Sequence, residues 1–275
     1  MKNTVVILLL CLFGVQTFAQ RKPKIKGNRN VVETRQELPP FNAIELNDDV
    51  PVVLENANAP GVAIEADENL LEVLRFDVVN EVLTISSFYK ITSKKKLNIK
   101  VFHTGLFSID VRAGELAMKD VISTASLKVR TSGTARVELN ATADVIDLTM
   151  EGISSGDLNV ASDSLMVTLK DRIDAKIYST GKTNTVFMYK NASAKWEGST
   201  DSLKATLYGN SDLKAEKLEA RQANLIMEDS PNARILALDQ FNLTSKGSAK
   251  TSLYGNPKII MDSFLDTSQL HKENN

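Results

Sequence analysis

The sequence predicts an all-β protein folded as a solenoid, a β-helix with coils of about 20 residues. Three observations predict it. Strand-like segments recur at a nearly constant spacing through the second half of the chain. Aromatic residues make up only 6% of the chain, whereas β-branched and small polar residues are plentiful, a mixture typical of short strands and tight turns. One column of the repeat is apolar, as a row that faces a core should be.

The N-terminal stretch MKNTVVILLLCLFGVQTFAQ has the pattern of a secretory signal. Lys2 supplies a positive charge, residues 4–15 are apolar, and the triplet that ends at Ala19 is a cleavage site of the A-x-A kind. We therefore predict a signal peptide over 1–19, cut between Ala19 and Gln20. The apolar run is shorter than the roughly 20 residues that a membrane-spanning helix needs.

Cys11, the single cysteine, falls within the predicted signal. A lipoprotein signal that uses Cys11 is the rival interpretation, but Leu10 stands where a small residue is expected. We predict an exported chain without disulfides, in the periplasm, at the cell surface or secreted. The net charge of −1 gives no reason to expect nucleic acid as a partner. No later apolar stretch has the length of a membrane span, so we predict none in the mature chain.

The segments that precede the repeat differ in composition. Residues 20–40 are basic and then polar, and we predict a spacer there. From Phe41 the chain alternates apolar and polar residues as strands do. One short stretch after Asp67 has the leucine spacing of a helix of one or two turns, with Asp67 as its N-cap. We predict a β-helical domain over 41–259 and a tail over 260–275 that frays or caps the last coil.

A repeat takes over at about residue 114, and each unit opens on a small residue with one exception. The intervals between the opening positions are 21, 21, 19, 19, 19, 20 and 16 residues. Such a unit is too short for two helices and lacks the leucine ladder of leucine-rich repeats, so it fits one coil of a β-helix. The opening positions are Gly114, Ala135, Gly156, Ala175, Ala194, Leu213, Ala233 and Ala249.

Two residues past the opening positions the chain is apolar, which predicts an inward-facing column. Trp196, the only tryptophan, occupies this column next to Ala215 of the following coil. A large residue beside a small one fits a narrow core, so we predict a buried Trp196 rather than a sugar-binding one. The column contains Val137, Leu158, Ile177, Trp196, Ala215 and Ile235.

Two outward columns, one and three residues past the opening positions, share the solvent face. The first is mostly basic and the second partly acidic. One interpretation is a solvated, charged face that resists aggregation. The other is a groove for an anionic glycan, in which Tyr178 stacks on a sugar ring. The candidate ligand-contact residues are Arg136, Lys176, Tyr178, Lys195, Lys214 and Arg234.

The sequence offers little for catalysis. The two histidines are far apart, and neither a metal-binding H-x-x-H or C-x-x-C spacing nor a phosphate-binding glycine loop occurs. The pairs Asp48 with Asp49 and Asp171 with Asp174 are typical of turns. A polysaccharide lyase, with carboxylates or calcium on adjacent coils, is the enzyme alternative. We expect a protein without enzymatic activity and without a cofactor.

Several segments resemble a known family. FNAIELNDDVPVVL, VAIEADENLLEVL, LNIKVFHTGLFSIDVRAGEL and the later YGNPKI are similar to the putative auto-transporter adhesin head GIN domain family of exported Bacteroidetes proteins. The resemblance covers about Phe41 to Ile259. It implies a right-handed single-stranded β-helix and an adhesin-like role, and it provides no catalytic or ligand residues to transfer.

These features predict a non-catalytic, exported protein of the cell envelope that contacts a glycan or an envelope protein along an outer face. One weak contact per coil would add up to avidity. The alternatives are a lyase-type enzyme and a purely structural envelope module. Two motifs, at residues 163–165 and 201–203, resemble O-glycosylation acceptors of exported Bacteroidetes proteins, which makes Ser164 and Ser202 candidate modification sites.

Overall fold

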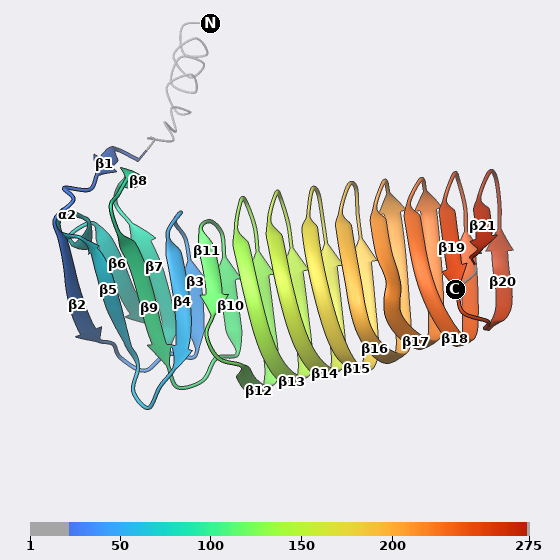
Figure 1. The fold of residues 1–275 in the computed structure, drawn as a ribbon, viewed down its shortest axis with the longest axis horizontal. Helices are drawn as coiled ribbons and strands as arrows, with labels where there is room; N and C mark the ends of the chain where they lie inside the picture. Colours follow the sequence, from blue (N-terminus) through green and yellow to red (C-terminus); the bar gives the residue numbers. More distant parts are fainter. Residues whose placement is uncertain (1–21, 274–275) are drawn as a thin grey trace, which may run out of the picture.

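The protein is an elongated β-solenoid, as the repeat predicts (Figure 1). The computed structural model describes residues 22–273, so the predicted signal peptide 1–19 and its cleavage site at Ala19 and Gln20 lie outside the described residues. The fold is 71% strand and has about nine turns with a repeat of about 19 residues. Within the described residues no helix is long and apolar enough to cross a membrane.

The N-terminal block consists of short strands and one helical turn, drawn in blue to green in the left part of Figure 1. Six of its strands already belong to the solenoid, because β7, β3 and β10 pair in parallel in that order, and so do β9, β4 and β11. The elements are β1 (Lys24–Lys26), β2 (Val31–Glu37), β3 (Ala43–Leu46), β4 (Pro51–Asn56), β5 (Gly61–Asp67), α2 (Glu68–Leu71), β6 (Leu74–Val79), β7 (Val82–Ser87), β8 (Lys90–Ser93), β9 (Leu97–His103), β10 (Ser108–Val111) and β11 (Glu115–Met118).

The regular part consists of long strands, each of which makes most of one coil. Each pairs in parallel with the next, and β13, β14, β15 and β16 do so without a shift of register. The backbone hydrogen bonds continue through the turns between coils, where successive carbonyls and amides also pair. The strands are β12 (Ile122–Thr131), β13 (Arg136–Met150), β14 (Ser155–Leu169), β15 (Asp174–Met188), β16 (Ser193–Gly209), β17 (Asp212–Asp229) and β18 (Asn232–Ser245).

Each long strand bends near its middle and so has a first and a second arm. In β13, buried residues alternate from Val137 to Ala143, and then Asp144 and Val145 are both exposed. Alternation resumes at Ile146. Two exposed neighbours break the alternation of period two that a straight strand requires. They mark the corner, after which the buried side chains point back towards the first arm.

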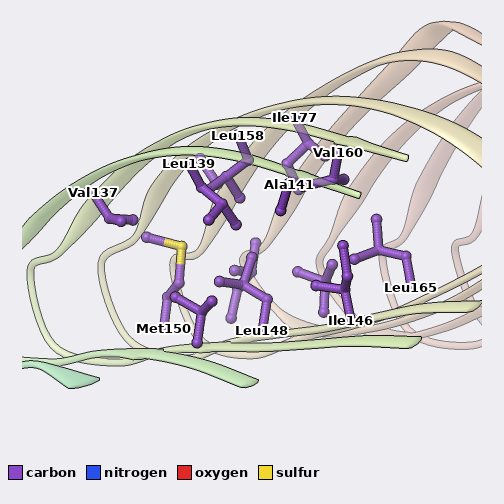
Figure 2. Close-up of a cluster of buried hydrophobic side chains, with 14 of the residues drawn as sticks. Val137, Leu139, Ala141, Ile146, Leu148, Met150, Leu158, Val160, Leu165 and Ile177 are labelled. Carbon is purple, nitrogen blue, oxygen red and sulfur yellow. The ribbon is translucent and has the colours of Figure 1, made fainter. Parts of the chain in front are cut away.

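The core is the narrow bore between the two arms. In Figure 2, Leu139 and Leu158 on the first arms of neighbouring coils face Leu148 on a second arm. Near the turn the bore has little room: a Cβ atom added at Gly156 would lie only 3.1 Å from Cε of Met150. Packing of apolar side chains inside this bore stabilises the stack of coils.

The register confirms the middle of the predicted repeat. Five predicted opening positions are Cα partners in successive coils and point into the bore. Their spacing of 19 or 20 residues is the length of chain that returns each strand to the same point one coil further. These five positions are Gly156, Ala175, Ala194, Leu213 and Ala233.

Three predicted opening positions were wrong by two residues. Gly114 has a φ of 81°, and its Cβ position would lie 2.5 Å from the carbonyl oxygen of Val50, so it belongs to a turn. Ala135 also closes a turn, since its amide donates to the carbonyl of Ser132. Small residues suit these turns as well as the strand starts, and the sequence pattern did not separate the two. The column contains Leu116, Val137 and Thr251 in place of Gly114, Ala135 and Ala249.

Trp196 is fully buried, as predicted. Its Nε1–H donates to Oγ of Ser179 at 2.7 Å, and Nδ2 of Asn184 donates to the same oxygen at 2.9 Å. The next coil bulges at this level, because Ala215 and Glu216 together stand opposite Trp196 alone. The bore therefore makes room for the indole with a small neighbour and an extra residue, and it satisfies the polar end of the indole internally.

Antiparallel strands close the N-terminal end of the solenoid. β2 pairs antiparallel with β5, β5 with β9, and β6 with β7. The predicted spacer 20–40 thus contains two strands of the fold, and β2 forms an outer layer. The guanidinium groups of Arg35 and Arg75 lie 4.7 and 4.5 Å from the ring centroids of Phe102 and Phe88. β2 presents mainly charged and polar side chains to solvent.

Asp67 joins three segments of the N-terminal end. It precedes α2, as predicted, but its side chain makes no capping hydrogen bond. Its buried carboxylate instead accepts hydrogen bonds from the amides of Lys95 at 3.0 Å, Lys96 at 3.1 Å and Arg29 at 3.2 Å. These hydrogen bonds, that of Lys95 first, hold the pKa of Asp67 below its usual value.

The last described residues continue the solenoid. β19 (Lys250–Tyr254) and β20 (Lys258–Phe264) pair in parallel with the two arms of β18, and β21 (Gln269–Lys272) pairs with β19. β20 crosses the predicted boundary between the domain and the tail 260–275. The predicted tail therefore contributes most of one strand and all of another.

We expect Asp67→Asn to destabilise the protein, because the amide loses the negative charge that accepts three backbone hydrogen bonds. The pKa of Asp67 is lower in the folded than in the unfolded state. Its contribution is therefore present above the unfolded-state pKa of about 4 and is lost as the pH falls through the folded-state pKa. Urea unfolding at pH 7 and pH 3 measures this: wild type should lose stability on acidification by more than the variant does.

The matched control is Asp49→Asn, since Asp49 is an exposed aspartate of the same N-terminal block. This control should leave the pH dependence of the wild type unchanged. A wild-type and an Asp67→Asn protein with the same loss of stability between pH 7 and pH 3 would contradict the role given to Asp67.

We expect Ser179→Ala to lower the free energy of unfolding by about 1–3 kcal/mol, because it leaves buried donors of Trp196 and Asn184 without their acceptor. Ser199→Ala, at an exposed position of the next coil, should change it by less than about 0.5 kcal/mol. Chemical denaturation followed by tryptophan fluorescence measures both. Equal effects of the two variants would show that the buried hydroxyl does not contribute.

Candidate functional site

Most of the predicted ligand-contact residues gather on the outer face of the first arms. Lys176, Lys195, Lys214 and Arg234 are Cα partners in four successive coils. They form a column with a spacing of about 4.8 Å per coil, hereafter the basic ladder. Tyr178 lies on the same face, two residues after Lys176, and its surface is 50% exposed.

Arg136 lies outside the basic ladder, contrary to the prediction. Its Cα partner is Ser155, whereas Glu138 and Asp157 continue the column of the ladder towards the N-terminus. The prediction counted from Ala135, which is two residues before the true start of that coil. The Arg136 guanidinium lies beside the column, 3.6 Å from the carboxylate of Glu138.

Every cation of the basic ladder has a carboxylate partner. The closest pair joins Nζ of Lys195 to Oε1 of Glu197 at 2.9 Å. This hydrogen bond raises the pKa of Lys195 and lowers the pKa of Glu197, which also pairs with Lys217. The face therefore has little uncompensated positive charge to attract an anionic ligand. The other pairs are Lys176–Asp157, Lys214–Asp212 and Arg234–Glu216.

A shallow depression of about 480 Å³ lies on this face, over the first arms of β13 to β16. Its charged lining is mixed: Lys176, Lys195, Glu138, Asp157 and Glu197. Asn140, Asn159 and Tyr178 are Cα partners in three successive coils and form a second, uncharged column in the same lining. The depression thus combines amide groups, an exposed aromatic ring and paired charges.

Asn140 and Asn159 were missed as candidate residues by the sequence analysis. Counting one 19-residue repeat back from Asn159 leads to Asn140, so the signal was present once the repeat length is known. Within the described part of the chain, neither side-chain amide has a hydrogen-bond partner. Amide groups can both donate to and accept from the hydroxyls of a sugar, and the ring of Tyr178 offers a flat surface for stacking.

The candidate modification sites lie at the corner between the arms. Ser164, Thr183 and Ser202 are Cα partners in three successive coils, and both serines are half-buried. Asp163 next to the first serine pairs with Lys182 at 2.9 Å. The two motifs are therefore aligned on one edge of the solenoid, away from the depression.

Two of the four carboxylates considered for catalysis, Asp48 and Asp171, have structural partners. Asp48 accepts a hydrogen bond from the amide of Ser87 at 2.8 Å. Asp171 accepts one from the amide of Gly152 at 3.3 Å and forms an ion pair with Lys190. Across residues 22–273, no group of three or more His, Cys, Asp or Glu side chains could hold a metal ion.

We expect Glu197→Gln to lower the pKa of Lys195, because the hydrogen bond and the charge that raise it are lost. An NMR titration of the lysine side-chain signals measures this shift. Glu219→Gln removes an exposed carboxylate of the same face and should leave the pKa of Lys195 unchanged. An unshifted Lys195 in Glu197→Gln would contradict the pairing.

The family model described as "Putative auto-transporter adhesin, head GIN domain" (DUF2807) matches residues 40–257. A search of curated proteins returned no match.

Solved structures of similar fold come from Parabacteroides. A putative adhesin of P. merdae is 16% identical with a TM-score of 0.64, and the match covers 91% of this chain and 100% of that one. A putative adhesin of P. distasonis is 15% identical with a TM-score of 0.68, over 90% and 100% of the two chains. A putative lipid binding protein of P. distasonis is 17% identical with a TM-score of 0.63, over 90% and 100%. At these identities the likeness establishes the fold alone.

Proposed function

This chain belongs to the family described as "Putative auto-transporter adhesin, head GIN domain", and from that membership we propose an exported, non-catalytic binding protein of the cell envelope. In this proposal it contacts a glycan through the outer face of the first arms. The site is the depression over β13 to β16. Export is consistent with the predicted signal peptide, and the periplasm or the cell surface is the place of action.

The observation that supports this site is the uncharged column of Asn140, Asn159 and Tyr178. Two amides without protein partners and a half-exposed ring follow one another at the spacing of the coils, about 4.8 Å. A pyranose unit is about as long as this spacing, so successive hydroxyls of one chain would meet successive amides. The open, shallow shape suits an extended polymer better than a small molecule.

The charge pattern favours a neutral glycan over the anionic one considered from sequence. Each cation of the basic ladder has an acidic partner, and the depression itself has three carboxylates for two lysines. An anionic chain would meet this mixed field without net attraction. Neutral sugars can instead exchange hydrogen bonds with both carboxylates and amides.

Lipid binding, the description given to one neighbour of similar fold, finds less support in this chain. A buried acyl chain needs an apolar hollow, whereas the bore is filled by side chains such as Trp196 and Phe241, both fully buried. Two of the four carboxylates considered for a lyase, Asp48 and Asp171, accept hydrogen bonds from backbone amides. A purely structural module would leave the amides of the depression without a role.

A glycan array probed with the exported form, lacking residues 1–19, tests the proposal at low and moderate salt. We expect binding to neutral glycans that changes little with salt, because the contacts are hydrogen bonds and stacking rather than ion pairs. Tyr178→Ala and Asn159→Ala should each weaken binding about tenfold, since loss of a stacked ring or a hydrogen-bond pair removes about 1–2 kcal/mol.

Matched controls are Tyr254→Ala and Asn232→Ala, which alter the same residue types on the first arms of later coils, outside the depression. These variants should bind like the wild type. Binding only to acidic glycans, lost at moderate salt, would favour the basic ladder instead. If no glycan on the array binds at either salt concentration, the glycan proposal is overturned, and a protein partner or a structural role is favoured.

A further inference from the structure

The bore of the solenoid is open at its C-terminal end. Ile259 and Met261 of β20 are the Cα partners of Phe241 and Leu243, which are completely buried. They therefore occupy the next layer of the core. With no described coil beyond them, they are 41% and 53% exposed.

The exposed layer extends to the far end of β20. Phe264 is the partner of the buried Ser245 and is 39% exposed, and Leu265 beside it is 52% exposed. Terminal units of solenoid proteins normally present a polar outer face. A run of four large apolar side chains on an open end is instead typical of an interaction surface.

The same end has unpaired backbone edges on two levels. β20 pairs only with β18, and β21 pairs only with β19, among the strands described. Because β21 lies on β19, it stands one coil further out than β20, on the opposite arm. The end is therefore a step of one coil, with β20 on the low side and β21 on the high side.

We propose that this end is a self-association surface, on which a second copy of the chain docks end to end. A half-turn about an axis along the strands brings β21 of the second copy beside β20 of the first, and β20 of the second beside β21 of the first. The low side of each step then receives the high side of the other. The contact is the same for both copies and closes as a dimer.

The direction of the chain is consistent with this pairing. The two arms of a coil run in opposite directions, as the facing residues Leu139 with Leu148 and Ala141 with Ile146 show (Figure 2). Rotation about the strand axis preserves the direction of each strand. β20 and β21 of different copies would therefore pair antiparallel, and the side chains that face the bore in one copy would also face it in the other.

Charge also supports a second copy as the partner. β20 has Asp262 and β21 has Lys272, so the two strands that would pair have side chains of opposite charge. Neither side chain has an ion-pair partner among residues 22–273. The N-terminal end differs, because antiparallel strands lie over it and β2 presents mainly exposed polar residues.

The oligomeric state of the exported form, lacking residues 1–19, tests the inference. Light scattering after size exclusion and sedimentation equilibrium should show a dimer that dissociates on dilution. Met261→Lys places a charge on the open bore and should raise the dissociation constant at least about tenfold. Met166→Lys makes the same change at an exposed methionine on the outer face of a second arm and should leave the dimer intact.

A charge exchange gives a second, independent readout. Asp262→Lys alone should weaken the dimer, and Asp262→Lys combined with Lys272→Asp should restore it, while circular dichroism confirms that both variants fold. A monomer at all concentrations would overturn the inference. So would a dimer that survives Met261→Lys, a dimer lost equally in Met166→Lys, or open-ended filaments, since the proposed contact closes after two copies.

Discussion

Parallel stacking of coils in one register is the constraint on which the rest of the structure depends. Each long strand of the middle coils pairs along its length with the coil before it and the coil after it. A shift by one residue would reverse every side chain between bore and solvent. The 19-residue repeat is the consequence, because each coil must return to the same point while its inward positions stay inward.

That constraint also shapes the places where the register breaks. The bulge at Ala215 and Glu216 adds a residue opposite Trp196, and the coil regains register afterwards with Leu207 and Met227 as partners. The indole thus fits without loss of the column that follows. Ser179 provides the acceptor that a buried indole N–H requires, so the bulge and the buried hydroxyl together accommodate the largest side chain of the core.

The outer face and the two ends follow from the same stacking. Because residues one repeat apart become neighbours, charges of the basic ladder would repel each other if the adjoining positions did not have carboxylates. Their pairing leaves the amide column beside Tyr178 as the distinctive chemistry of that face. Stacking also leaves an unfinished layer at each end. Antiparallel strands and Asp67 close the first end, whereas the apolar layer of β20 stays open.

The sequence by itself determined the β-solenoid, the approximate repeat and the burial of Trp196, because periodic alternation and spacing are local properties of the chain. Only the tertiary structure decided the register of the outer coils, since small residues such as Ala135 suit turns and strand starts equally. That choice moved Arg136 out of the ladder and brought Asn140 beside Asn159. The sequence also did not predict the antiparallel strands that close the N-terminal end. Antiparallel pairing of distant strands depends on which backbone edges remain free after the coils have stacked.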